Sequence, residues 1–315
     1  MAGTVTHAFF AIDVYNSLNQ KLKTNLKDYQ NNLKTFGQGH DVFSFSNKHK
    51  SNEFHNNNTR DFFINTINYI KNNNLNDNYE ILSYLYGYIC HYVLDKSIHP
   101  FVAYKTGNYV KKYKNTYKYR CKHSDMETYL DSYMINMKEN MEPGKFKSHK
   151  YCLEPYKFSK ELNDVIDYSF YSTFNLKKAN KYYRQGIRRM HYLYPLLRND
   201  KYGIKKKIYR IVDKITPKYS YKFSPISFAY KPNEKDYYLN LDRKEWNHPM
   251  YKDEKYHTSA IDIYNNSIKE AKSIIENVDK YLCGKDIDLN IIFDNSSFST
   301  GKDCNDKTIQ QFFEN

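Results

Sequence analysis

The amino-acid sequence predicts an all-α, multi-helix protein, and three observations support this prediction. Apolar residues recur at helical spacing along most of the chain, whereas the strict alternation typical of strands is scarce. Apolar residues make up 40% of the 315 residues, and Tyr (34) and Phe (19) are abundant, which indicates a packed core rather than disorder. No internal repeat or low-complexity linker divides the chain, so we expect one large domain.

The helices follow from apolar stripes, taken in chain order. Residues 7–22 (HAFFAIDVYNSLNQKL) place Phe10, Val14 and Leu18 on one face of a helix. The same spacing predicts further helices over residues 59–73, 78–95, 123–138, 159–174, 178–197 and 258–282.

The remaining stretches are expected to be loops or tail. Only DLNIIF, at residues 288–293, has the composition of a strand. We therefore assign a helical domain to residues 1–285 and a polar C-terminal tail to residues 286–315. Loops are predicted over residues 35–47, which contain Gly37 and Gly39, over residues 223–238, and before the EWNHP of residues 245–249.

The chain is basic, with a formal net charge of +14 and a pI of about 9.2. This charge fits an anionic partner such as phospholipid headgroups or nucleic acid. It fits equally well a general amino-acid composition in which the proportions of Lys, Asn, Tyr and Ile are all high, as AT-rich codons would cause. The basic run YGIKKKIYRIVDK (202–214) is interpreted as a solvated face of an ordinary amphipathic helix rather than a nucleic-acid groove.

Cysteine usage and the first residues bear on the cellular compartment. The five cysteines form no CxxC pair, and their odd number leaves at least one thiol free, so we expect no disulfide framework. The N-terminal residues lack the charged start, apolar stretch and cleavage site of a signal peptide. No run approaches the ~20 apolar residues that a transmembrane helix needs. We expect a cytoplasmic protein, with export by a non-standard route left open.

Histidines and carboxylates cluster in HYVLDKSIHP, at residues 91–100. His91 and Asp95 stand four residues apart, so on a helix their side chains converge on one point. Pro100 disfavours helical geometry at the preceding residue, so we expect the helix to end at His99. A second pair, His123 and Glu127, repeats the spacing of four. One such pair is commonly a surface hydrogen bond, whereas two pairs with a histidine between them indicate metal ligands.

Three further candidates lie upstream: His7, Asp41 and His55. With the residues of the two pairs and His99, they supply enough nitrogen and oxygen ligands for two or more tetrahedral sites without a thiolate, which suits zinc. The histidines without a carboxylate at ligand spacing are predicted to be ordinary surface or interior residues, and these are His49, His149, His191 and His257. His248 is less distinctive, and its neighbours Trp246 and Pro249 are interpreted as packing residues.

In this ordered set the sequence resembles the bacterial zinc-dependent phospholipase C family, whose fold is shared with single-strand-specific zinc nucleases. The resemblance is carried by an early TH, by GQGHD, and by a histidine fourteen residues after the aspartate of that motif. GYICHYVLDKSIHP and HSDME continue it, and EWNHP is similar to the family further along the chain. The resemblance covers most of the predicted helical domain.

The resemblance implies a close pair of zinc ions. His55, His91 and Asp95 would hold one ion, and Asp95 would bridge to a second ion shared with His7. Asp41 matches the acidic residue that orients or deprotonates the attacking water. Clustered cations lower the pKa of bound water and neutralise charge on the phosphate and on the leaving alkoxide.

The resemblance also implies a third zinc, held by His99, His123 and Glu127, so two or three ions are expected. His40 adjoins Asp41, but proline is common at that position in the family, and we predict a loop role for it.

The implied function is a phosphodiesterase of phospholipase C type that hydrolyses the glycerol–phosphate bond of a phospholipid, with peripheral contact to an anionic membrane surface. A nuclease acting on single strands through the same metals is an alternative, with nucleic acid the less favoured partner. A catalytically weak protein that zinc merely stabilises is another.

Overall fold

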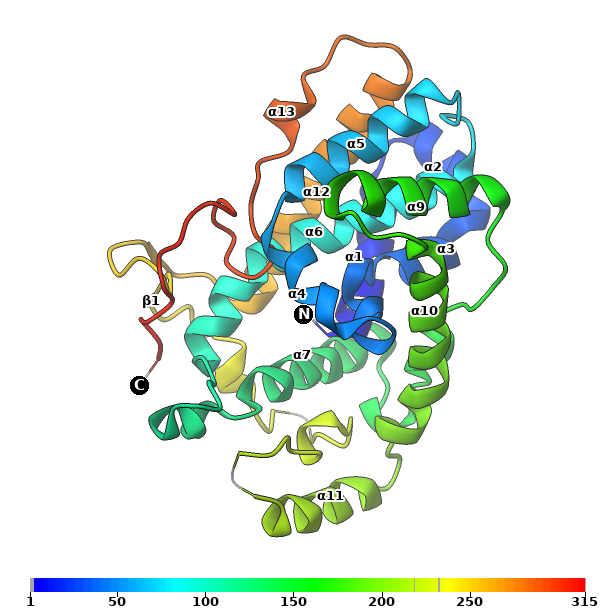
Figure 1. Ribbon diagram of the computed structural model, residues 1–315. Coiled ribbons are helices and arrows are strands. Elements are labelled where there is room, and N and C mark those ends of the chain that lie inside the picture. The colour runs from blue at the N-terminus through cyan, green and yellow to red at the C-terminus, as the bar shows by residue number, and fades with distance from the viewer. Residues whose placement is uncertain (1–2, 218, 232, 315) are drawn as a thin grey trace.

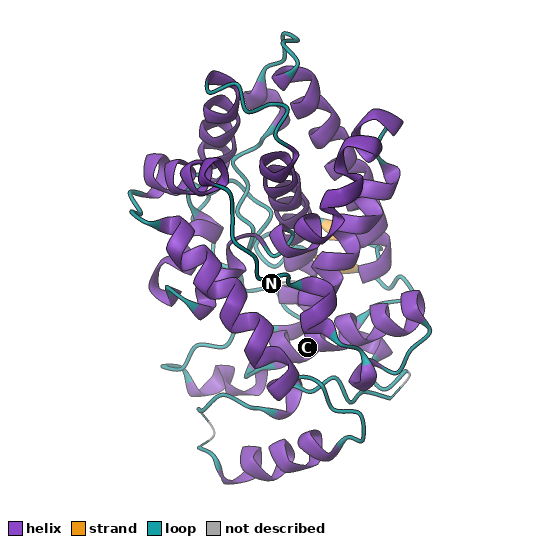
Figure 2. Ribbon diagram, turned by 90° about the vertical axis from the view of Figure 1, so that its right-hand side faces the viewer, coloured by secondary structure: helices purple, strands orange, loops and turns teal. Residues whose placement is uncertain are grey.

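The structure, a computed structural model, describes residues 3–217, 219–231 and 233–314 and is mostly helical (Figure 1, Figure 2). The all-α prediction is confirmed. The longer helices are α1 (Thr4–Ser17), α5 (Thr59–Asn72), α6 (Tyr79–Thr106), α7 (Lys122–Glu139), α9 (Lys160–Phe174), α10 (Ala179–Leu197), α11 (Ile204–Ile215) and α12 (Ala260–Leu282).

Short elements connect these helices. The short α-helices are α2 (Gln20–Leu26), α3 (Gln30–Phe36), α4 (Lys48–Asn56), α8 (Ser148–Cys152) and α13 (Leu289–Ile292). The 3-10 helices are η1 (Lys27–Tyr29), η2 (Gly39–Phe45), η3 (Lys114–Tyr119), η4 (Pro143–Lys145), η5 (Ser224–Ile226) and η6 (Asp236–Tyr238). Two strands, β1 (Trp246–Asn247) and β2 (Lys255–Tyr256), pair antiparallel with Trp246 opposite Tyr256.

Helix α6 runs through the centre of the molecule and packs against α1, α3, α7 and α12. Its side chains are buried around almost its whole circumference, as expected of a helix that is apolar on every face. Gly87 lets α3 approach closely, because a Cβ there would lie 2.8 Å from Cβ of Phe36. The side chain of Asn78 caps the start of α6 by accepting a hydrogen bond from the backbone N–H of Ile81.

The prediction that this helix ends at His99 is wrong, because α6 continues through Pro100 to Thr106. Burial of the segment outweighs the local preference of the residue before proline. The helix ends instead at Gly107, whose φ of +65° lies in the left-handed region that glycine adopts without strain. The extra turns keep His99 on the same helix as His91 and Asp95.

Other boundaries also differ from the predictions. The helix expected over residues 7–22 is instead two helices, α1 and α2, because the side chain of Asn19 caps the start of α2. The loop expected over residues 35–47 is largely the helical η2, which is buried from Gly39 to Phe43. Among the described residues of 223–231 and 233–238, the chain is loop with two single 3-10 turns, close to the prediction.

The segment predicted as a strand, residues 288–293, contains helix α13 instead. Asp288 caps it by accepting a hydrogen bond of 2.8 Å from the backbone N–H of Asn290, a local bond that favours a helical start over an extended chain. Phe293 then stacks on Phe63 with ring centroids 4.7 Å apart. The chain beyond it folds back along α6 towards the middle of the molecule.

None of the helices in the described part of the chain combines the length and the apolar character needed to cross a membrane.

Candidate metal centre

Helix α6 supplies three ligand side chains from one face. His91, Asp95 and His99 follow each other at intervals of four residues, and all three are buried. Nε2 of His91 lies 3.4 Å from Oδ2 of Asp95, and Nδ1 of His99 lies 3.9 Å from Oδ1 of Asp95. The spacing predicted from the sequence therefore brings these side chains together.

The first group of ligand atoms combines this helix with α1 and η2. It contains His7, Asp41, His91 and Asp95, whose ligand atoms lie within 4.8 Å of one another. Nε2 of His7 is 3.1 Å from Oδ1 of Asp95, and Nε2 of His91 is 3.9 Å from Oδ2 of Asp41. All four side chains are buried, so a cation bound here would be shielded from solvent.

Two backbone features hold α1 and η2 against α6. The buried carboxylate of Asp131 accepts hydrogen bonds of 2.8 Å from both the backbone N–H and the hydroxyl of Thr6, one residue before His7. Gly39 has a φ of +50°, and a Cβ there would lie 2.0 Å from Cδ2 of His91. Only glycine therefore allows η2 to approach the His91 ring.

The second group contains His40, Asp41, His55 and His91, again with ligand atoms within 4.8 Å of one another. Nε2 of His55 lies 3.1 Å from Oδ1 of Asp41, while its Nδ1 bonds to the carbonyl oxygen of Ser51 at 2.7 Å. Asp41 and His91 thus belong to both groups. The structure groups His55 with Asp41 and His91, whereas the family resemblance implies a set of His55, His91 and Asp95.

His40 is the member of this group that sequence reasoning missed. Its Nδ1 hydrogen-bonds to the hydroxyl of Tyr88 at 2.7 Å. Its Nε2 is buried and has no hydrogen-bond partner among the described residues. The only sequence signal for His40 was its place between Gly39 and Asp41, because it has no carboxylate at helical spacing.

The third group lies between α6 and α7 and contains His99, His123 and Glu127. Nε2 of His123 is 2.6 Å from Oε1 of Glu127, and Nε2 of His99 is 3.9 Å from the same oxygen. Nδ1 of His99 donates a hydrogen bond of 2.6 Å to the carbonyl oxygen of Phe298, which turns Nε2 towards the group.

Burial and neighbouring side chains together set the protonation states that metal ligands need. Burial lowers the pKa of His91 to about 3, and it also lowers the pKa of His99 and, more strongly, that of His40. Burial alone would raise the pKa of Asp95, but the histidines around it hold that pKa well below its ordinary value. The pKa of Glu127 is likewise held well below its ordinary value, because His123 outweighs burial. Near neutral pH, His40, His91 and His99 are therefore neutral, and Asp95 and Glu127 are ionised.

The donor set fits zinc. Imidazole nitrogens and carboxylate oxygens are common zinc ligands, and the three groups offer only these. His55 and His99 each use their second ring nitrogen on a backbone carbonyl, which is the orienting contact typical of zinc-bound histidines. The buried, unpartnered Nε2 of His40 is a further donor that a cation would satisfy.

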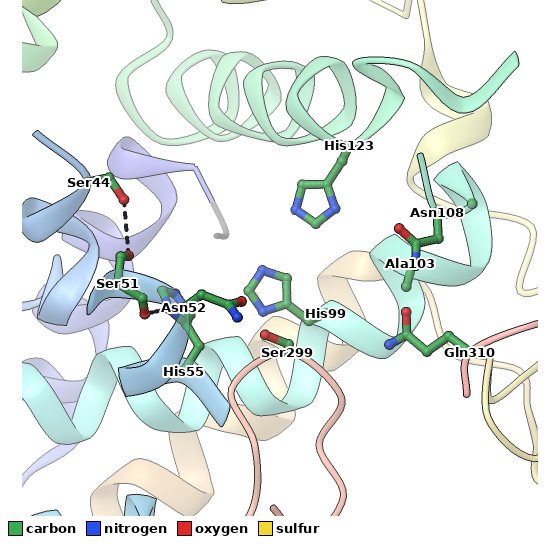
Figure 3. A pocket seen from close by; sticks show the side chains of 11 residues that line it. Ser44, Ser51, Asn52, His55, His99, Ala103, Asn108, His123, Ser299 and Gln310 are labelled. Atoms are coloured by element: carbon green, nitrogen blue, oxygen red, sulfur yellow. Dashed lines mark hydrogen bonds between the residues drawn. The ribbon is translucent and has the colours of Figure 1, made fainter. Parts of the chain in front are cut away.

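A cavity of about 350 Å³ opens beside the groups (Figure 3). His55, His99 and His123 line it, together with Asn52 and Ser299. Figure 3 shows His99 and His123 facing one another from α6 and α7, with Ser299 of the C-terminal segment next to His99. The site therefore has a buried side, at His7 and Asp95, and a side open to a ligand.

The structure brings together all eight residues selected from the sequence, and these are His7, Asp41, His55, His91, Asp95, His99, His123 and Glu127. The side chain of His49 lies outside the described part of the structure, and His149, His191, His248 and His257 lie outside the groups. His149 and His191 pack against each other with ring centroids 5.4 Å apart. Nε2 of His248 bonds to the carbonyl oxygen of Thr300 at 3.0 Å, and His257 is exposed near Glu245.

A family model described as zinc dependent phospholipase C matches residues 6–184, which include every residue of the three groups. No curated protein and no solved structure matches the chain.

Proposed function

Because the chain belongs to the zinc-dependent phospholipase C family, a family of hydrolases, we propose that it cleaves the glycerol–phosphate ester of a phospholipid with water as the nucleophile. The observation that carries this proposal is the convergence of three groups of ligand atoms beside one open cavity. A cavity of about 350 Å³ suits a phosphate-bearing headgroup, while the acyl chains would stay outside.

The proposal assigns the ligands to two or three zinc ions. His7, His91 and Asp95 would hold one ion, and His40, His55 and one carboxylate oxygen of Asp41 would hold its neighbour. His99, His123 and Glu127 would hold a further ion. Zinc in these positions supplies Lewis acidity, which lowers the pKa of water and neutralises charge on a phosphodiester.

Asp41 is proposed to orient the attacking water and accept its proton. Its Oδ1 lies 3.1 Å from Nε2 of His55, which lines the cavity, so the carboxylate lies directly behind the cavity wall. It is almost completely buried, so its oxygens are held in place and shielded from bulk water. Asn52 and Ser299 offer hydrogen bonds to the headgroup from the open side of the same cavity.

The test is made on full-length protein purified without a chelator. Elemental analysis gives the zinc content per chain, and product analysis follows phosphatidylcholine, phosphatidylethanolamine, phosphatidylglycerol and single-stranded DNA. We expect two or three zinc ions, and release of diacylglycerol together with a phosphorylated headgroup.

The other outcomes discriminate between functions. Cleavage of single-stranded DNA without release of diacylglycerol would replace the proposal with a nuclease. One zinc ion and no turnover of any phosphodiester would indicate a protein that the metal stabilises without catalysis. Protein free of zinc after such a purification would overturn the metal assignment itself.

A further inference from the structure

Helix α11 turns its apolar face to solvent. Ile204, Ile208, Ile211 and Ile215 recur at intervals of four and three residues, so they form one stripe on a helix with about 3.6 residues per turn. These side chains are between 52% and 79% exposed. The helix is amphipathic and most of its basic residues are solvated, as predicted, but its apolar stripe faces solvent, whereas an ordinary amphipathic helix would bury it.

Charged and aromatic side chains attach the opposite face of α11 to the protein. Nζ of Lys206 lies 3.0 Å from the ring centroid of Tyr230, and the Lys206 side chain is only 6% exposed. The carboxylate of Asp213 accepts hydrogen bonds of 2.7 and 3.0 Å from the backbone N–H groups of Phe223 and Ser224. These contacts fix the rotation of the helix about its own axis, so the isoleucine side chains point to solvent.

Basic residues border the stripe. Lys207 and Lys214 are exposed on one side of it, and Arg210 lies beyond them. Nζ of Lys205 bonds to the carbonyl oxygen of Leu196, which places the exposed end of α10 next to the start of α11. The Leu196 side chain is itself exposed, so it extends the apolar surface.

The position of α11 relates this surface to the metal centre. Figure 1 and Figure 2 both show the helix at the lower edge of the molecule, apart from the main helical body. The chain after α11 bonds to the loop that follows α6: the carbonyl of Tyr219 accepts a bond from Tyr109, and that of Pro217 from Arg120. The first residues of that loop, Gly107 and Asn108, line the cavity.

We propose that α11 is an interfacial helix that docks the protein on a bilayer containing anionic phospholipid. The isoleucine stripe would lie among the headgroups and upper acyl chains, and Lys207 and Lys214 would contact the anionic phosphates. The net charge of +14 favours the same surface. The choice of a bilayer rests on the proposed function, whereas the binding itself requires no turnover.

A second copy of the chain fits this surface less well. An antiparallel two-fold contact between two α11 helices would place Lys207 and Lys214 of both copies along the same edge, and like charges repel. One twelve-residue helix also offers less area than a stable dimer interface of about 800 Å² per partner.

The experiment measures vesicle flotation of the full-length protein with phosphatidylcholine vesicles that either contain or lack phosphatidylglycerol. The test variant is Ile208→Gln with Ile211→Gln, because glutamine keeps helix propensity and removes apolar surface. The control is Ile291→Gln, an exposed isoleucine (84%) on the distant α13. We expect the parent and the control to bind the anionic vesicles, and the double variant to bind at least about tenfold more weakly.

Equal binding of the double variant and the parent, or no binding of the parent, would overturn the proposal. So would a parent dimer in analytical ultracentrifugation that the double variant abolishes while vesicle binding persists. A second assay measures hydrolysis of a short-chain phospholipid below its micellar concentration, where no membrane surface is present. It therefore distinguishes failure of this inference from failure of the proposed function. Unchanged hydrolysis in the double variant supports docking, and vesicle binding without hydrolysis by any variant refutes only the proposed function.

Discussion

Nε2 of His55 and Oδ1 of Asp41 lie 3.1 Å apart, while Nδ1 of the same ring bonds to the carbonyl oxygen of Ser51 at 2.7 Å. A carbonyl oxygen only accepts hydrogen bonds, so the proton of a neutral His55 ring is on Nδ1. Nε2 then presents a lone pair to a carboxylate. Two acceptors this close require a proton or a metal cation between them, and two more imidazoles, those of His40 and His91, converge on the same point.

Asp41→Asn tests the proposed role of the carboxylate in proton transfer. Asparagine keeps an oxygen in the same position, which can still bind zinc supplied in excess, but it is a far weaker base, so we expect turnover to fall by about 100-fold or more at full zinc occupancy. Steady-state kinetics with elemental analysis on the same sample measure both quantities. Turnover equal to that of the parent would show that Asp41 does not accept the proton.

His91→Ala tests the residue shared by two of the groups. We expect loss of at least one zinc ion and of phosphodiesterase activity, because His91 contributes to both the first and the second group. The control is His191→Ala, a histidine whose Nδ1 bonds to the carbonyl oxygen of Leu153, away from the centre. Equal loss of zinc in both variants would contradict the assignment.

His40→Gln tests the ligand that the sequence did not reveal. If the buried Nε2 binds metal, zinc affinity measured by competition with a chromophoric chelator should fall by about 10- to 100-fold. Tyr88→Phe removes the hydroxyl that holds Nδ1 and should have a smaller effect in the same direction. His248→Gln alters a buried histidine outside the groups and should leave the affinity unchanged. Parental affinity in His40→Gln would remove His40 from the ligand set.

Gly39→Ala tests the approach of η2 to α6. The added methyl group would lie 2.0 Å from Cδ2 of His91, so we expect the free energy of unfolding to fall by at least about 2 kcal/mol and zinc to be lost. Gly284→Ala is the matched control, because its φ of +86° is equally unfavourable for alanine while nothing lies within 4 Å of the added atom. It should cost about 1–2 kcal/mol and retain zinc. Zinc retained in both variants would show that the close approach is not needed.

Lys206→Met tests how α11 is attached to the protein. Burial lowers the pKa of Lys206 to about 8 in the folded protein, below the ordinary value of 10.5. Between these two pH values the unfolded chain binds more protons than the folded protein, so this group makes stability rise with pH. We expect the parent to gain about 3 kcal/mol over Lys206→Met across that range, measured by urea unfolding. A constant difference would contradict this view of Lys206.

The sequence predicted those parts of the site that depend on one helix. Predicting that His91 meets Asp95 and that His123 meets Glu127 required only a spacing of four residues on a helix, and each pair does lie on one helix. The meeting of His7, Asp41 and His55 depends on how α1, η2 and α4 pack, which residue spacing does not encode. Those three residues were selected as candidates by residue type, and only the family resemblance gave them roles in one centre. His40 was missed because the resemblance gave no ligand at its position.

Two differences between prediction and structure, at Pro100 and at α11, have physical causes that lie outside the chain segment concerned. The proline rule describes an isolated helix, and at Pro100 burial from all sides outweighed it. The spacing of the isoleucines identified the apolar stripe of α11 correctly, but spacing alone does not show whether that stripe faces the core or the solvent. The contacts of Lys206 and Asp213 decide that, and their partners come from other segments.

The contact between His99 and Phe298 has a consequence for the order of events during synthesis. Phe298 also donates its backbone N–H to the carbonyl oxygen of His55, at 2.9 Å, so one residue near the C-terminus adjoins two ligands from the first third of the chain. A nascent chain exposes all its metal ligands long before the ribosome reaches Phe298. Until then the ring of His99 lacks the carbonyl that turns its Nε2 inward. His99 is therefore synthesised 199 residues before the carbonyl that orients its ring, so the final orientation of this ligand depends on a distant part of the chain.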